Sequence, residues 1–156
     1  MRNEQYDLEL GPALMTFEFV SERPQGLIKK RVLFEQTPKK NLYNLAFGDI
    51  NPETNDIDDL AITNNNDRDK VLATVAATVY IFTTAYPDAI IYAAGSNPVR
   101  TRLYRIGISN NLEELQEQFY VFGLSERIGW VSYEKNTNYL AFFIKRKNLE
   151  KNGTNS

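Results

Sequence analysis

The sequence contains neither cysteine nor histidine among its 156 residues. Without cysteine the chain forms no disulfide. Without either residue it has no zinc finger, no cysteine or serine–histidine nucleophile and no histidine-ligated haem. Together the two absences exclude thiol, imidazole and zinc chemistry. The lack of disulfides also agrees with the reducing cytoplasm, which is where we expect the protein to be.

Long apolar runs are missing as well. A membrane-spanning helix needs about 18 consecutive apolar residues, and the nearest approach, residues 71–86, contains four threonines. The first ten residues are polar and acidic, without the basic and apolar regions of a secretory signal. We therefore expect no membrane partner and no export.

The chain has no large excess of one charge. Lys and Arg number 18 against 20 Asp and Glu, a net charge of −2, which disfavours coating of nucleic acid by global charge but allows a local basic patch. With 42% hydrophobic and 24% charged residues, the sequence is typical of a globular protein with a real core. We expect one domain over residues 1–147 and a flexible polar tail over 148–156.

The first sixty residues have the period of β-strands. Large apolar side chains recur at every second position in residues 15–19, 28–34 and 43–47, with Lys30 as the exception in the middle run. Turn residues such as Pro24 and Pro38 separate the runs. Because the connections are short, we expect a mainly antiparallel meander, continued by a strand near residues 56–62.

The second half begins with a helical period. Residues 67–86 place apolar side chains three and four apart, with Asn66 or Asp67 as the N-terminal cap and Pro87 as the end. Residues 88–94 then predict a strand buried on both faces, and 99–106 a second helix stopped by Gly107. A short helical start near residue 110 and two or three closing strands follow.

These elements predict an α+β fold. We expect a twisted, mainly antiparallel sheet of about six to eight strands, packed on one long helix with one or two shorter helices.

One strand-to-helix connection is a candidate anion site. A buried strand passes through Gly95 and Ser96 into a helix that carries Arg100, Arg102 and Arg105. Unpaired amides at a helix start attract anions, and an arginine in the first turn can hold a phosphate or carboxylate through two hydrogen bonds. Helical spacing puts Arg102 beside Arg105 but Arg100 about 200° from Arg102, so only two of the three arginines converge.

A simpler interpretation stays open for this segment. Ser96 or Asn97 is then only a helix cap, Pro98 is a first-turn proline, and the arginines are solvated or paired with the acidic stretch 113–117. The glycine pattern matches neither a phosphate-binding P-loop nor a dinucleotide fingerprint.

The start of the long helix is the second candidate. If the strands that precede the two helices are parallel neighbours, both connections open at the same sheet edge, where open sheets bind ligands. Arg68 and Lys70 then join Arg100 around a shared hollow. Alternatively, Asp67 and Asp69 pair with these cations and leave no site, because acids at a helix start are stabilising by themselves.

The acidic segment 49–59 resembles a calcium loop only superficially. Counted from Asp49, the sixth position is Thr54 instead of glycine and the twelfth is Leu60 instead of glutamate. A solvated hairpin connection explains the segment. A carboxylate- or metal-dependent hydrolase would have to draw on the following residues: Asp49, Asp56, Asp58, Asp59, Asp67 and Asp69.

Two basic runs, with aromatic residues near the second of them, raise the alternative of a nucleic-acid surface. The runs 29–31 and 145–147 are basic, and Tyr133, Tyr139 and Phe143 lie near the second run. Consecutive strand residues point to opposite faces, however, so a basic run does not form one stripe. Core packing of the aromatics is the favoured interpretation.

Three strings in the sequence resemble a known family. They are residues 41–49 (NLYNLAFGD), residues 67–76 (DRDKVLATVA) and Gly95-Ser96 followed by residues 100–104 (RTRLY). Together they are similar to a family of small uncharacterised bacterial proteins, carried largely by Bacteroidetes and classed as a domain of unknown function. The resemblance spans residues 5 to about 147 and implies a single bacterial domain, with no known activity, cofactor or site residue.

We predict a binding module without a cofactor, whose partner is an anionic ligand or nucleic acid. The expected ligand-binding residues are Arg68, Lys70, Ser96, Arg100, Arg102 and Arg105. The alternative is a protein-interaction or homo-oligomeric accessory protein that uses an exposed sheet face or edge. An enzyme, including the hydrolase above, is the less favoured class because histidine and cysteine are absent.

Overall fold

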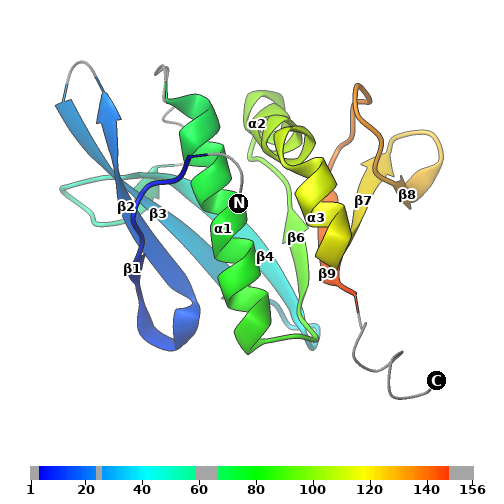
Figure 1. Cartoon of the computed structure of the whole chain (residues 1–156), viewed down its shortest axis with the longest axis horizontal. Coiled ribbons are helices and arrows are strands. Elements are labelled where there is room, and N and C mark those ends of the chain that lie inside the picture. The colour runs from blue at the N-terminus through cyan, green and yellow to red at the C-terminus, as the bar shows by residue number, and fades with distance from the viewer. Residues whose placement is uncertain (1–3, 24–25, 59–66, 148–156) are drawn as a thin grey trace.

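A mixed, mostly antiparallel sheet forms one layer of the molecule, and three α-helices lie against one of its faces (Figure 1). The computed structural model describes residues 4–23, 26–58 and 67–147; the predicted flexible tail lies outside them. Within these residues the strands are β1 (Glu9–Leu10), β2 (Thr16–Arg23), β3 (Gly26–Gln36), β4 (Leu42–Ile50), β5 (Ile57–Asp58), β6 (Ile90–Ala93), β7 (Phe119–Ser125), β8 (Gly129–Ser132) and β9 (Phe142–Arg146). The helices are α1 (Arg68–Ala85), α2 (Pro98–Asn110) and α3 (Leu112–Gln118), with a 3-10 helix at Pro12–Leu14.

The strand order confirms the predicted α+β class. The sheet runs β1-β2-β3-β4-β6-β9-β7-β8, with β5 also paired to β4. Among the described strands only β4 and β6 pair in parallel. Two of the nine strands, β1 and β5, have two residues each, and they account for the excess over the expected six to eight. Of the strand expected near residues 56–62, β5 is the described part.

The alternating pattern in β2, β3 and β4 puts one face of each strand into the core. The inward side chains are Phe17, Phe19, Val32, Phe34, Tyr43, Leu45 and Phe47, all buried. Lys30 keeps the inward phase of β3 and is buried too, because it forms an ion pair with Asp49 directly opposite on β4. Asp49 therefore belongs to a strand and not to the solvated acidic turn that the sequence predicted.

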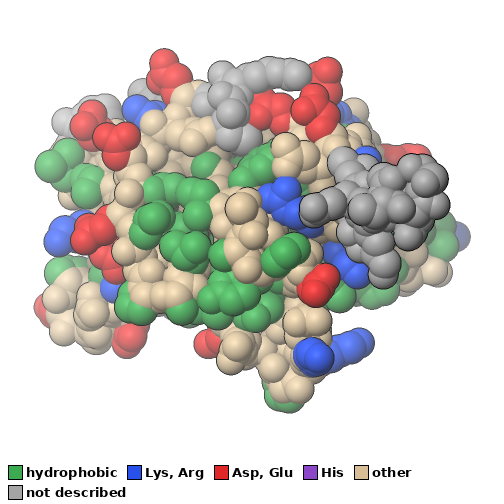
Figure 2. Space-filling model, turned by 60° about the horizontal axis from the view of Figure 1, so that its bottom comes forward, with side chains coloured by type: hydrophobic (Ala, Val, Ile, Leu, Met, Phe, Trp, Pro, Cys, Tyr) green, Lys and Arg blue, Asp and Glu red, His purple; other side chains and the backbone are tan. Residues whose placement is uncertain are grey.

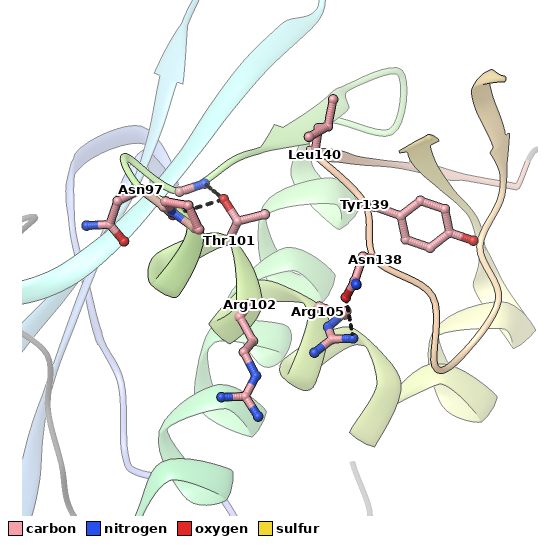
Figure 3. A pocket seen from close by; sticks show the side chains of 9 residues that line it. Asn97, Thr101, Arg102, Arg105, Asn138, Tyr139 and Leu140 are labelled. Atoms are coloured by element: carbon pink, nitrogen blue, oxygen red, sulfur yellow. Dashed lines mark hydrogen bonds between the residues drawn. The ribbon is translucent and has the colours of Figure 1, made fainter. Parts of the chain in front are cut away.

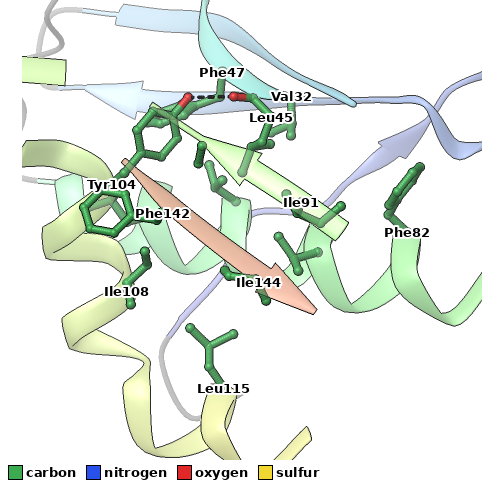
Figure 4. Packing of buried hydrophobic residues seen from close by; sticks show 14 of the residues in the cluster. Val32, Leu45, Phe47, Phe82, Ile91, Tyr104, Ile108, Leu115, Phe142 and Ile144 are labelled. Carbon is green, nitrogen blue, oxygen red and sulfur yellow. Dashed lines mark hydrogen bonds between the residues drawn. The ribbon is translucent and has the colours of Figure 1, made fainter. Parts of the chain in front are cut away.

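Helix α1 packs across the sheet through its apolar face, on which Phe82 is the buried aromatic residue (Figure 4). The ring of Phe82 stacks on Phe34 with centroids 4.1 Å apart and meets Tyr43 edge-on at 4.9 Å. Ile91 of β6 and Ile144 of β9 extend the same core toward α2 and α3. The predicted long helix is thus the element on which the sheet is assembled.

The far end of α1 packs against the 3-10 helix. Tyr86, which follows the last helical turn, donates a hydrogen bond from its hydroxyl to the carbonyl oxygen of Ala13 at 2.8 Å. Figure 2, which turns this end of the molecule forward, shows hydrophobic side chains in the middle of the surface and charged side chains mostly around them. The N-terminal segment is therefore held against α1 at this end.

Strand β6 corrects one prediction. It lies in the middle of the sheet, between β4 and β9, but it is not buried on both faces. Ile91 and Ala93 are buried under the helices, whereas Ile90 and Tyr92 point to the other face and are partly exposed. The reason is that all three helices cover the same face of the sheet (Figure 1).

Helix α2 corrects a second prediction. It continues through Gly107 to Asn110 instead of ending at the glycine. A Cβ at Gly107 would lie 3.4 Å from the Leu72 side chain of α1, so this glycine sits where the two helices approach each other closely. A glycine in a helical pattern here marks helix packing and not a helix end.

Arg146 joins β9 to the helices. Its guanidinium group donates to the carbonyl oxygen of Tyr80 at 3.1 Å, to Thr83 Oγ1 at 3.0 Å and to Gln118 Oε1 at 2.7 Å. It also lies 4.9 Å from the ring centroid of Phe119. Burial lowers the pKa of this guanidinium from its ordinary value. Arg146 is thus a structural residue on the helix side of the sheet.

Tyr80 makes the stability of the protein depend on pH in the alkaline range. Burial raises the pKa of its hydroxyl to about 12, and Glu114 and Glu117 add to the rise. Because the fold favours the neutral phenol, this contribution to stability is complete below about pH 10 and is lost as the pH rises toward 12. We expect the free energy of unfolding of the wild-type protein to fall between pH 9 and pH 11, as measured by urea unfolding. The free energy of unfolding of Tyr80→Phe should fall less over the same range. Equal declines in both proteins would contradict this assignment.

Candidate functional site: a groove beside helix α2

An open groove of about 430 Å³ lies between the first turns of α2 and the segment that leads into β9 (Figure 3). Its polar lining comes from Asn97, Thr101, Arg102, Arg105 and Asn138, and its apolar lining includes Pro98 and Leu140. Two smaller hollows, of about 40 and 20 Å³, also contain residues from the predicted arginine segment.

Gly95 allows the start of α2 to fold back onto the end of β6. A Cβ at this position would lie 2.3 Å from the amide nitrogen of Thr101, so no larger residue fits without a backbone shift. The Gly95 amide donates to Thr101 Oγ1 at 3.1 Å. Asn97, and not Ser96, is the N-cap, because its side chain accepts from the Arg100 amide at 2.9 Å.

These contacts use most of the donors that a helix start can offer to an anion. Pro98 has no amide hydrogen, and the amides of Arg100 and Thr101 bond to Asn97. Val99 is then the one first-turn residue whose amide has no hydrogen-bond partner within the described part of the chain. The positive character of the groove therefore comes from its arginines and little from the helix amides.

Arg102 and Arg105 both line the groove, as their helical spacing predicts. Arg105 donates from Nη1 to Asn138 Oδ1 at 3.0 Å, so a neutral side chain orients it, and Arg102 is exposed. Figure 3 shows both guanidinium groups extending from α2, with Asn138 beside Arg105. Neither arginine forms an ion pair with the residues described here.

Arg100 lies outside the groove, so the predicted cations do not surround a single hollow. Its side chain is only 5% exposed, donates from Nη2 to the carbonyl oxygen of Phe47 and lies 5.3 Å from the Phe47 ring centroid. With Arg68, Lys30 and Asp49 it lines a separate cavity of about 20 Å³. The two helix starts lie at the same end of the sheet (Figure 1), and Arg68 and Arg100 line this small cavity together, whereas Arg102 and Arg105 line the groove.

The other predicted residues also lie outside the groove. Arg68 is 52% exposed, and its Nε is 3.7 Å from Asp69 Oδ1. Lys70 Nζ sits 4.2 Å from the ring centroid of Tyr6, where it packs on the N-terminal segment. Ser96 is exposed and is not among the residues that line the groove.

Asp67 has a structural contact in place of the predicted cap. It holds the N-cap position of α1, but its side chain makes no capping hydrogen bond. Instead Oδ2 accepts from the hydroxyl of Tyr6 at 2.7 Å and from that of Ser21. Burial, together with the hydrogen bond to Asp67, raises the pKa of Tyr6. In the described ranges, no group of three or more acidic side chains is arranged to hold a metal ion.

The sequence did not reveal two pairs of residues that line these hollows. Asn138 and Leu140 line the groove from a loop whose position depends on β9, and nothing in their local sequence marks them. The buried pair of Lys30 and Asp49 had one signal, the lysine that interrupts an apolar alternation. That signal indicates a buried charge with a partner but does not identify the partner.

The alternative of a basic and aromatic surface does not include the two tyrosines near the C-terminal basic run. Tyr133 and Tyr139 are buried in the core, as the favoured interpretation of the aromatics expected. Phe143 points to the face of the sheet that no described helix covers, together with Lys145, while Arg146 points to the helices. Strand alternation splits the basic run, as the sequence predicted.

The fold and the groove define an α+β protein with one helix-covered sheet face and an open, arginine-lined hollow at the helix side. Residues 2–147 match the Family of unknown function (DUF6934), and the chain belongs to that family. No curated protein and no solved structure matches the chain. In the described part of the chain, no helix is long and apolar enough to cross a membrane.

Proposed function

We propose that the protein is a binding module that takes a small ligand with a phosphate or carboxylate group in the groove beside α2. The observation that carries the proposal is the convergence of Arg102 and Arg105 on one hollow without a neutralising acid among the described residues. A planar guanidinium group binds phosphate or carboxylate through two parallel hydrogen bonds. We place this function in the cytoplasm of a bacterium, in line with the absence of cysteine and the family resemblance.

The dimensions and lining of the groove support a ligand larger than a bare ion. Its volume of about 430 Å³ falls within the range of about 300–1,000 Å³ that small-molecule sites occupy. Pro98 and Leu140 add apolar surface beside the arginines, and Asn138 adds amide hydrogen-bonding capacity. The arrangement suits an acidic group attached to an apolar or aromatic body.

Arg102→Ala tests the proposal through ligand-induced stabilisation. A ligand that binds only the folded state raises the melting temperature, by the equivalent of about 2.7 kcal/mol at a hundredfold excess over Kd. We expect phosphate or citrate to raise the melting temperature of the wild-type protein, relative to chloride at equal ionic strength, and Arg102→Ala to lose this rise.

Arg127→Ala is the matched control, because Arg127 is an exposed arginine on the β7–β8 turn. It should keep the full anion-dependent rise. An undiminished rise in Arg102→Ala, or an equal loss in Arg127→Ala, would show that the groove is not the binding site.

A further inference from the structure

The face of the sheet that the helices leave uncovered carries a contiguous group of aromatic side chains. We call it the aromatic face, and it consists of Tyr92, Tyr120, Phe122, Trp130 and Phe143, on strands β6, β7, β8 and β9. Figure 1 shows the helices on the opposite side of the sheet. The aromatic face is thus on the other side of the sheet from the helices that form the groove.

Strand register brings these rings into rows. Tyr92 pairs with Phe143, and Phe143 pairs with Phe122, so three adjacent strands present one aromatic side chain each at the same level. The Phe122 and Phe143 rings stack with centroids 4.5 Å apart, and Trp130 meets Phe143 edge-on at 4.8 Å. The rings therefore form a continuous surface instead of scattered exposed residues.

One lysine lies within this surface and a second at its end. In the next row Lys145 stands between Ile90 of β6 and Tyr120 of β7, its partners in the strand register, and is exposed. Lys147, which follows β9, places its Nζ 5.5 Å from the ring centroid of Tyr120 and donates from it to the carbonyl oxygen of Gln116 at 2.6 Å. Tyr120, whose side chain is 50% exposed, thus lies beside both lysines, and Trp130, 43% exposed, lies at the other end of the aromatic face, level with Leu124 of β7.

The area of the aromatic face helps to decide which kind of partner it binds. The aromatic face spans four strands about 4.8 Å apart and about five residues along each strand, with a rise of about 3.3 Å per residue. Its area is therefore roughly 300 Å². A stable protein dimer buries about 800 Å² on each partner, so this area is too small for one. It suffices for a few nucleotides, and aromatic rings beside lysines are the chemistry that binds stacked bases and their phosphates.

We propose that the aromatic face binds single-stranded nucleic acid, with bases stacked on Tyr120 and Trp130 and phosphates held by Lys145 and Lys147. This function does not depend on the groove beside α2 and goes beyond the small-ligand site proposed there.

Trp130 is the only tryptophan of the chain and reports directly on binding. Titration with oligothymidylate of twelve nucleotides at low salt should quench its fluorescence and raise the anisotropy of a labelled oligonucleotide. With two phosphate contacts, the logarithm of the binding constant should fall with the logarithm of salt concentration with a slope of about −1.4. Absence of both signals at low salt would overturn the proposal.

Variants test the two parts of the surface separately. We expect Lys145→Glu and Tyr120→Ala each to weaken binding at least tenfold, and Tyr120→Phe to retain it. The matched control is Lys29→Glu, at an exposed lysine on β3, which is separated from β9 by strands β4 and β6. It should change the affinity less than twofold; an equal effect of Lys29→Glu would overturn the assignment.

Three further outcomes would contradict this inference. Equal affinity for a duplex of the same length would indicate phosphate contacts without base stacking. A dimer that Tyr120→Ala dissociates would assign the aromatic face to a second copy of the chain. Loss of oligonucleotide binding in Arg102→Ala would move the nucleic acid to the groove, whereas unchanged binding in that variant agrees with two separate sites.

Discussion

Phe82→Ala should destabilise the protein by about 3–5 kcal/mol, one of the two largest effects that we expect from a single substitution. Phe82 is completely buried and contacts Phe34 from β3 and Tyr43 from β4 at the same time. The substitution removes apolar contact area and leaves a cavity between α1 and two strands that cannot collapse independently. For a domain of this size the melting temperature should fall by about 10 °C, measured by thermal unfolding followed by circular dichroism.

Phe143→Ala is the matched control for this prediction. It removes the same side-chain atoms, but from strand β9 on the aromatic face, where the ring is partly exposed. Phe143→Ala should lower the free energy of unfolding clearly less than Phe82→Ala, because it removes less buried apolar surface. If both variants lost equal stability, Phe82 would not have the central packing role that its contacts indicate.

Asp49→Asn should cost about 3 kcal/mol or more, although it changes only one atom of the side chain. Lys30 is 2% exposed and Asp49 17% exposed, and the pair joins β3 to β4 at directly opposite positions. The substitution removes a counter-charge from the desolvated Lys30, and breaking a buried ion pair on one side typically costs about 3–5 kcal/mol, more than the intact pair contributes. Urea unfolding at pH 7 measures the loss.

A double variant separates charge imbalance from simple loss of packing. Lys30→Met combined with Asp49→Asn removes both charges and should recover part of the stability, since buried pairs are often replaced by apolar residues at little cost. Lys29→Met, the exposed neighbour, should stay within about 0.5 kcal/mol of the wild type. A double variant less stable than Asp49→Asn would contradict the charge argument.

Local pattern was enough to predict the meander and the long helix. The alternation in β2, β3 and β4 and the three-to-four spacing in α1 arise from each element burying one face of its own, and that requirement is visible in a short window of sequence. The strand β6 was misjudged for the same reason. Its run of apolar residues looks the same whether the second face is covered by helices or by aromatic neighbours such as Phe143.

The candidate site was only partly predictable. Helical spacing correctly paired Arg102 with Arg105 and set Arg100 apart, because the angle between residues on one helix does not depend on the rest of the fold. The contribution of Asn138 and the burial of Arg100 against Phe47 depend on how α2 lies on β4 and where the loop before β9 runs. Both depend on contacts between segments far apart in the chain, for which the local sequence carries no signal.

The amino-acid order alone therefore decided the α+β class, the main elements and the chemistry that is excluded by the absence of histidine and cysteine. Tertiary structure decided which cations share a hollow, which acids are already paired, and that one face of the sheet keeps its aromatic side chains uncovered. The division has a physical cause. Side-chain periodicity is a property of neighbouring residues, whereas the convergence of charges and the covering of a sheet face depend on packing between segments far apart in the chain.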